Sequence, residues 1–296
     1  SFLLLLAPFG FLPYLPAYIL FIALTGLLYL HLLWTLRPHP TTLLLALGFI
    51  SFWVNLMAGQ NGFLTSCLIG WALVLMKRRP HMAGVLIGLL SFKPQLGLSI
   101  PLALLAGRHG RTFLMAGLAT LLLAAASGLA FGAAPWLAFA ENLRNPVTIL
   151  ESGRIPMSHM TSVFSALWIT GLPPFLCYLA QAVVAITANI ILFVVWRRDN
   201  TAFEIKGALL VLAMMLTTPH LFNYDMALLA LPLVLMWKHG EQTGWRWGER
   251  PILLLVWLAP LLLTPNGEDG KVNLLPLATL LMLGLVTRKC FKPVGG

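Results

Sequence analysis

Long apolar runs recur from one end of this chain to the other, and they constrain its fold more than any other feature. Of its 296 residues, 59% are hydrophobic and 9% are charged, whereas an ordinary soluble domain carries about 25% charged residues. Segments that cross a bilayer must satisfy their backbone hydrogen bonds internally, so such runs predict helices. No polar stretch is long enough to form a soluble domain. The sequence therefore predicts an all-α polytopic integral membrane protein, with residues 1–296 in a single transmembrane domain.

The net charge of +10 indicates membrane topology and no nucleic-acid partner. The basic residues form short clusters between apolar runs, as cytoplasmic loops do in multi-spanning proteins. The three cysteines are scattered and predict neither a disulfide framework nor a metal site. No nucleotide-binding or zinc motif is present, so we expect no cofactor and no metal.

The spans follow from run length. Residues 41–76 would make a single helix of about 54 Å, too long for a hydrocarbon core of about 30 Å. We expect Gly59–Gly62 to split this run into a hairpin, and residues 217–225 to split the run 202–236 in the same way. The other predicted elements are crossings at 16–36, 112–132, 173–196, 251–264 and 272–287, a surface helix at 162–170, outer intervals at 133–161 and 265–271, and cytoplasmic segments at 238–250 and 288–296.

The first 15 residues do not have the pattern of a full membrane crossing. Residues 1–15 are apolar but contain Pro8, Gly10 and Pro13, which predicts a short interfacial or re-entrant piece. Because Ser1 lies within an apolar run, we expect a transmembrane helix and a first outer loop to precede it.

Residues 82–107 hold a single charge, Lys93, followed directly by Pro94. Pro94 removes a backbone donor and disfavours helix at the preceding residue. If this segment enters the membrane and returns, only Arg144, Arg154 and Lys271 lie on the outer side. If it crosses, most basic residues fall outside, against the positive-inside rule. We therefore expect a re-entrant hairpin with Lys93 at its bend.

An ionised side chain at membrane depth usually faces a protein interior or a watery cavity. The functional interpretation of Lys93 is a phosphate or pyrophosphate contact, supported by nearby helix N-termini. The alternative is a structural lysine that reaches the interface or pairs with Asp225. Gly84 and Gly88 form a Gly-x-x-x-Gly pattern, which predicts close helix packing.

Other polar groups also interrupt apolar runs, and we expect them to share one outward-facing site with Lys93. Gln60 and Asn61 are candidates for binding sugar hydroxyls or phosphate, or alternatively a capped turn. Gln95, next to Pro94, is a further substrate-binding candidate. Arg154 and His159 in the outer interval are candidates for an anionic head group, with a solvated loop as the alternative.

The last polar group is His220 with Asn223, Tyr224 and Asp225. His220 and Asp225 are candidate acid–base or orienting groups, and Asn223 and Tyr224 are candidate substrate contacts. The alternative is a polar turn in which Asp225 caps the following helix.

Three blocks of the sequence stand out together: Gly59-Gln-Asn-Gly62, the span Ala83-Gly-Val-Leu-Ile-Gly-Leu-Leu-Ser-Phe-Lys-Pro-Gln95, and Thr218-Pro-His-Leu-Phe-Asn-Tyr-Asp225. In order and spacing these blocks resemble glycosyltransferase family 87, formerly domain of unknown function 2029. The resemblance implies a GT-C-like bundle with broken and re-entrant helices. It also implies transfer of a hexose, typically mannose, from a polyprenyl-phosphate donor to a lipid or glycan acceptor of the cell envelope.

The same resemblance implies roles and a location. Lys93 would contact the donor phosphate, with Gln60, Asn61 and His220 in the same cavity, and the enzyme would act on the outer side of the bacterial inner membrane. The acidic base of this class lies on a first outer loop, which would precede Ser1, so the fragment by itself is expected to lack it. Alternative hypotheses are a secondary transporter or flippase for an anionic lipid-phosphate substrate, and a non-catalytic assembly subunit.

Overall fold

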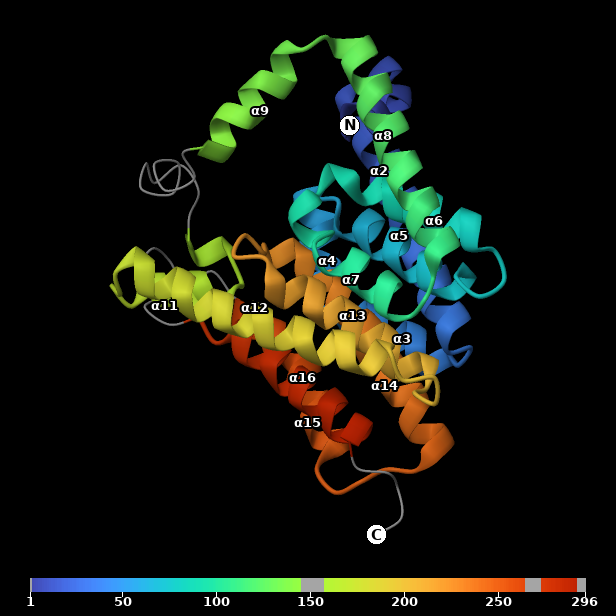
Figure 1. The fold of residues 1–296 in the computed structure, drawn as a ribbon, viewed down its shortest axis with the longest axis vertical. Helices are drawn as coiled ribbons and strands as arrows, with labels where there is room; N and C mark the ends of the chain where they lie inside the picture. The colour runs from blue at the N-terminus through green and yellow to red at the C-terminus, as the bar shows by residue number, and fades with distance from the viewer. Residues whose placement is uncertain (1, 145–156, 264–272, 292–296) are drawn as a thin grey trace.

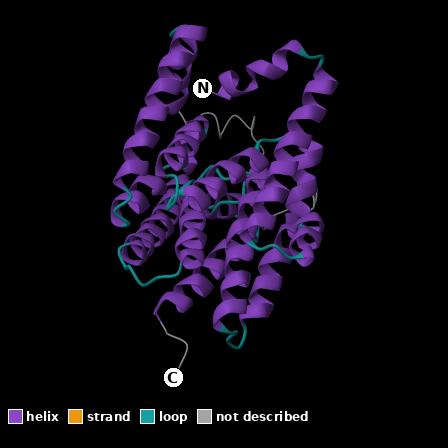
Figure 2. Cartoon of the chain, turned by 90° about the vertical axis from the view of Figure 1, so that its right-hand side faces the viewer, coloured by secondary structure: helices purple, strands orange, loops and turns teal. Residues whose placement is uncertain are grey.

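The computed structural model describes residues 2–144, 157–263 and 273–291 and contains helices without strands in that part of the chain (Figure 2). The α-helices are α1 (Phe2–Leu6), α2 (Tyr14–Leu36), α3 (Pro40–Gly48), α4 (Ile50–Ala58), α5 (Gly62–Leu75), α6 (Pro80–Leu89), α7 (Ser99–Ala106), α8 (Gly110–Phe131), α9 (Ala134–Arg144), α11 (Val163–Ile169), α12 (Pro174–Trp196), α13 (Phe203–Thr217), α14 (Ala230–Thr243), α15 (Glu249–Leu258) and α16 (Leu275–Phe291). Short 3-10 helices are η1 (Ala7–Phe11), η2 (Leu90–Phe92), η3 (Pro94–Leu96), η4 (Met157–His159), η5 (Asn223–Leu229) and η6 (Ala259–Leu263).

Three helices, α2, α8 and α12, are each long and apolar enough to cross a membrane, and the bent pair α3 and α4 raises the number to four. These counts cover the described residues. The other expected crossings contain shorter helices. Of these, α5, α13 and α16 are single helices of 14, 15 and 17 residues, whereas η5 continues into α14 and α15 into η6. The predicted all-α polytopic fold is confirmed.

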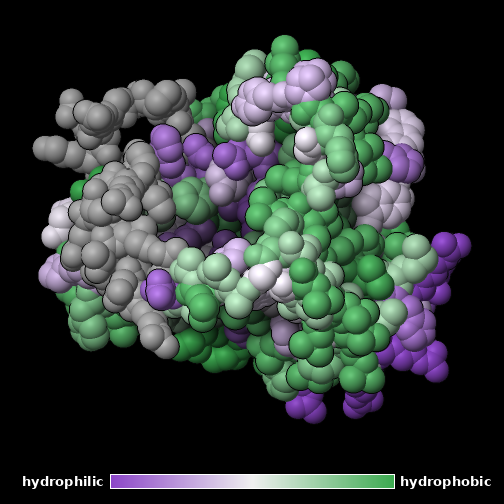
Figure 3. Space-filling view, turned by 90° about the horizontal axis from the view of Figure 1, so that it is seen from above, coloured by the Kyte–Doolittle hydropathy of each residue, from purple (hydrophilic) through white to green (hydrophobic). Residues whose placement is uncertain are grey.

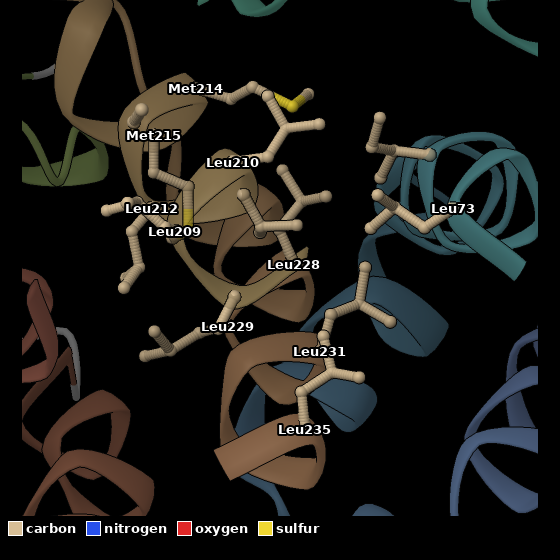
Figure 4. Close-up of a cluster of buried hydrophobic side chains, with 14 of the residues drawn as sticks. Leu73, Leu209, Leu210, Leu212, Met214, Met215, Leu228, Leu229, Leu231 and Leu235 are labelled. Atoms are coloured by element: carbon tan, nitrogen blue, oxygen red, sulfur yellow. The ribbon is translucent and has the colours of Figure 1, made fainter. Parts of the chain in front are cut away.

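The core is built around α13, whose residues from Glu204 to Leu216 are buried except Lys206. A helix that is apolar on every side belongs in the interior of a bundle. Side chains from α13, η5, α14 and α5 meet in its surroundings (Figure 4). Helices α2, α8 and α9 extend away from this body at the top of Figure 1, and much of the surface in that direction is hydrophobic (Figure 3).

The contacts between α6 and α8 show the relative direction of these two helices. A Cβ atom added to Gly84 would lie 2.6 Å from Met115 Cβ, and one added to Gly88 would lie 2.5 Å from Ala119 Cβ. The contacts advance together along both helices, so α6 and α8 run parallel. The glycines also permit this close approach, as the Gly-x-x-x-Gly pattern predicts.

Because α6 and α8 run in the same direction, the chain between them must return. It turns at η2 and η3, on either side of Lys93, and α7 leads back. Ser99 at the start of α7 bonds Thr217 at the end of α13 (2.9 Å), while Gly107, just after α7, packs against Trp196 at the end of α12. The predicted hairpin with Lys93 at its bend is therefore confirmed, whereas its entry into the membrane and return from the same side stay a prediction.

Three details of the predicted organisation are wrong, and one interval contains a helix that was not predicted. Residues 41–58 contain an additional 60° bend between α3 and α4. The interval 133–161, predicted only to lie on the outer side, contains α9. Helix α14 continues to Thr243 through part of the expected loop 238–250, and α16 continues to Phe291 into the expected tail. In each case the structure contains a bend or a length of helix that the polarity of the local sequence did not predict.

Candidate functional site

Lys93 lies at the bend of the re-entrant hairpin and is buried, with 5% of its surface exposed. Its backbone angles, φ −123° and ψ 69°, are not helical, as expected for a residue before proline. The ammonium group forms an ion pair with the Asp225 carboxylate and lies 4.6 Å from the centre of the Tyr224 ring. Lys93 is thus held from two sides by residues of η5.

Asp225 is buried more deeply than Lys93, with 1% of its surface exposed, and both of its carboxylate oxygens have partners. Oδ1 accepts from Lys93, and Oδ2 accepts the backbone N–H of Phe222 at 3.4 Å. Asp225 therefore caps η5 and neutralises Lys93, which matches the alternative interpretation of both residues.

The turn at Asn61 and Gly62 packs directly against the same segment. A Cβ on Gly62 would lie 2.3 Å from the Tyr224 carbonyl oxygen and 2.3 Å from Asn55 Oδ1. Asn55 Nδ2 donates to that Tyr224 oxygen at 2.7 Å. Asn61 Oδ1 is buried without a hydrogen-bond partner among the described residues. The predicted convergence of the three polar segments is confirmed by these contacts, whereas their roles in binding remain predictions.

His220 belongs to a loop that is held by the residues around Ser162. Ser162 Oγ donates to the Pro219 carbonyl at 2.6 Å, and the Thr161 N–H donates to the Leu221 carbonyl at 2.7 Å. The partly buried His220 ring lies 6.4 Å from the Phe164 ring, centre to centre. Among the described contacts, none joins His220 to Lys93 or Asp225 directly.

The remaining predicted site residues are spread around this centre. Gln60, Gln95, Asn223 and Tyr224 are partly buried, and His159 is exposed. The Tyr224 ring stacks on Phe222 with an angle of 4° between planes. Arg154 lies outside the described residues.

A comparison with known protein families decides the identity of the scaffold. The model of glycosyltransferase family 87 matches residues 1–219. The chain belongs to glycosyltransferase family 87. The match includes Gln60, Asn61 and Lys93 and ends one residue before His220. No curated protein and no solved structure matched the chain.

In this family 87 chain, sequence reasoning missed two buried amides that build the site. Asn55 bridges α4 and η5 by donating to the carbonyls of Ser51 and Tyr224. Gln181 on α12 donates to the Leu216 carbonyl at 2.7 Å and accepts the Phe164 N–H at 3.0 Å. The sequence contained a signal for both residues, because an amide side chain in an apolar span must find hydrogen-bond partners inside the protein.

A second buried ion pair was also missed. Lys289 Nζ lies 3.0 Å from Glu249 Oε2, and both side chains are at most 2% exposed. Both residues belong to polar segments that were predicted to lie outside the spans, so their burial was unexpected. This pair lies between the start of α15 and the end of α16, away from the Lys93 site. Among the described residues, no group of three or more His, Cys, Asp or Glu side chains is placed to hold a metal ion.

Proposed function

We propose that this family 87 glycosyltransferase moves a hexose, with mannose the first choice, from a polyprenyl-phosphate donor to a glycolipid or glycan acceptor of the cell envelope. The observation that carries the proposal is the buried ammonium of Lys93 at the bend of the hairpin, held by η5, against which the turn at Asn61 and Gly62 also packs. Buried cations at broken helices are the means by which membrane proteins bind anions. The donor phosphate supplies such an anion.

The chemistry of the proposal is a direct displacement. The acceptor hydroxyl oxygen forms a bond to the anomeric carbon while the bond from that carbon to the phosphate oxygen breaks. The lipid phosphate leaves with the bonding electrons, and a carboxylate takes the acceptor proton. Lys93 stabilises the leaving phosphate, because an ammonium has three N–H donors and Asp225 accepts one of them. The N-terminus of α5, at Gly62, adds positive potential.

We assign the base to a carboxylate other than Asp225, since both Asp225 oxygens already accept hydrogen bonds. The family resemblance gives that role to an acidic residue of a first outer loop. In this proposal Asp225 positions Lys93, and His220, Gln60 and Asn61 contact sugar or acceptor groups. The active side faces the exterior of a bacterial inner membrane.

The donor class can be tested directly. Membranes containing the protein, with any residues that precede Ser1, are supplied either with a labelled polyprenyl-phosphate hexose or with the same hexose as a nucleotide sugar. We expect label in a lipid or glycan product from the lipid donor alone, measured in membranes that cannot interconvert the two donors. Transfer from the nucleotide sugar alone would contradict the proposed donor.

A further inference from the structure

A laterally open apolar groove lies between α2, α3, α14 and α15 and has no part in the proposed reaction. Its volume is about 460 Å³, within the range of about 300–1,000 Å³ that is typical of small-molecule sites. Its walls are almost entirely apolar. Leu45 on α3 and Leu254 on α15 line it and are 43% and 55% exposed, so the groove opens at the surface of the molecule.

The apolar end of the groove is closed by Trp257, near the end of α15. Its indole N–H donates to the Leu45 carbonyl at 3.0 Å, and its ring lies 3.1 Å from the position of a Cβ added to Gly48. Trp257 thus joins α15 to α3 across the groove.

The other end of the groove is basic. Arg37 and Arg250 line it together with Trp237. Arg37 is paired with Glu241 through two hydrogen bonds of 2.8 and 2.6 Å and is therefore neutralised. The exposed Arg250 guanidinium lies 4.9 Å from the centre of the Trp245 ring and, within the part of the chain that the structure describes, has no carboxylate within ion-pair distance.

A smaller polar hollow of about 250 Å³ adjoins this basic end. It is lined by Arg37, Pro38, His39, Lys238, Glu241 and Gln242 and shares Arg37 with the groove. An apolar groove open to the side, with an arginine and a polar hollow at one end, matches a molecule with a long hydrocarbon chain and an anionic head. Trp237 and Trp245, whose rings lie 5.0 Å apart, mark this end as interfacial.

We propose that this groove binds one acyl chain of an anionic phospholipid and that Arg250 binds the lipid phosphate. The site is separate from the Lys93 centre. Helix α14 is about 21 Å long, and Asp225 precedes its start whereas Trp237 and Glu241 lie toward its end. The lipid therefore belongs to the leaflet opposite the proposed donor, and it would bridge α3 and α15, which both line the groove.

The test uses the delipidated chain in detergent, titrated with phosphatidylglycerol or phosphatidylcholine of identical acyl chains and measured by native mass spectrometry. We expect one phosphatidylglycerol to bind about fivefold more tightly than phosphatidylcholine, the preference that one basic residue confers near a membrane surface. Arg250→Gln should remove this preference. Arg198→Gln is the matched control, because Arg198 is likewise stacked on an aromatic ring, Phe291, at 4.3 Å but lies outside the groove.

Two variants that fill the groove complete the test. Ala46→Phe occupies its buried wall, and Leu254→Trp narrows it from a position that is 55% exposed, where misfolding is not expected. Both should lower the affinity for both lipids. Unchanged lipid binding in Leu254→Trp, or the same loss in Arg250→Gln and Arg198→Gln, would overturn the proposal. A dimer that Ala46→Phe abolishes, without any phospholipid adduct, would overturn it as well.

Discussion

At the scale of the residue, the central feature is an ion pair taken out of water. Removing one partner of a buried pair leaves an uncompensated charge and typically costs about 3–5 kcal/mol, whereas replacing both by apolar residues is often neutral. The pair of Lys93 and Asp225 therefore does not by itself indicate stability. Its position at the bend, with Tyr224 beside Lys93 and Asn61 on the adjoining turn, is what suggests a function.

Gly62 provides a test of how tightly the three segments fit. Gly62→Ala places a Cβ 2.3 Å from both Asn55 Oδ1 and the Tyr224 carbonyl oxygen. We expect it to destabilise the protein by about 1–3 kcal/mol, measured as a lowered midpoint of thermal unfolding in detergent. Gly117→Ala on α8 is the control, because nothing lies within 4 Å of its added Cβ. Equal unfolding midpoints for the two variants would show that the segments are not in close contact.

At the scale of the element, the hairpin around Lys93 could be predicted, because a charge and a proline occur together in an otherwise apolar segment. Lys93 and Pro94 break the helix locally, and the positive-inside rule determines that the chain returns. The bend at Gly48 and Phe49 could not be predicted in the same way. It depends on tertiary contacts, such as the Trp257 ring against Gly48, and no local charge marks it.

The parallel packing of α6 and α8 supports a coupled test. Gly88→Ala is expected to destabilise the protein, because the new Cβ would lie 2.5 Å from Ala119 Cβ. Ala119→Gly should restore part of the loss, but not all, since the Ala116 carbonyl also lies 3.0 Å away. A double-mutant cycle of unfolding midpoints measures the coupling. Strict additivity of the two changes would argue against the contact.

At the scale of the whole molecule, the membrane class and the three long spans α2, α8 and α12 were predictable, because the length of a hydrophobic run and the basic clusters beside it indicate them directly. The partners of Lys93 were harder to predict from the sequence. Asp225 is 132 residues away along the chain, and the sequence offered an ion pair only as the alternative to a phosphate contact. Gln181 and Asn55 were not predicted as site residues, although an amide side chain in an apolar helix requires a hydrogen-bond partner within the fold.

Topology can be measured by labelling single cysteines introduced at exposed positions. The three substitutions are Arg78→Cys, Arg111→Cys and Glu141→Cys. Position 78 precedes α6, position 111 lies at the start of α8, and position 141 lies on α9, which follows the end of α8. With a re-entrant hairpin, a membrane-impermeant reagent should label positions 78 and 111 from one side and position 141 from the other. Labelling of positions 78 and 111 from opposite sides would require the segment to cross instead.

The claim that Lys93 acts on the donor phosphate, and is not only one half of a structural pair, is tested most directly by replacing both charges. Lys93→Met combined with Asp225→Leu removes the pair without leaving an unpaired buried charge. We predict a folded protein, by thermal unfolding and gel filtration, whose hexose transfer from a polyprenyl-phosphate donor falls at least about 100-fold, the scale of losing one electrostatic stabiliser of the transition state. The matched double replacement of Lys289 by Met and Glu249 by Leu should keep its activity. Full transfer by the Lys93 and Asp225 double variant would contradict the account.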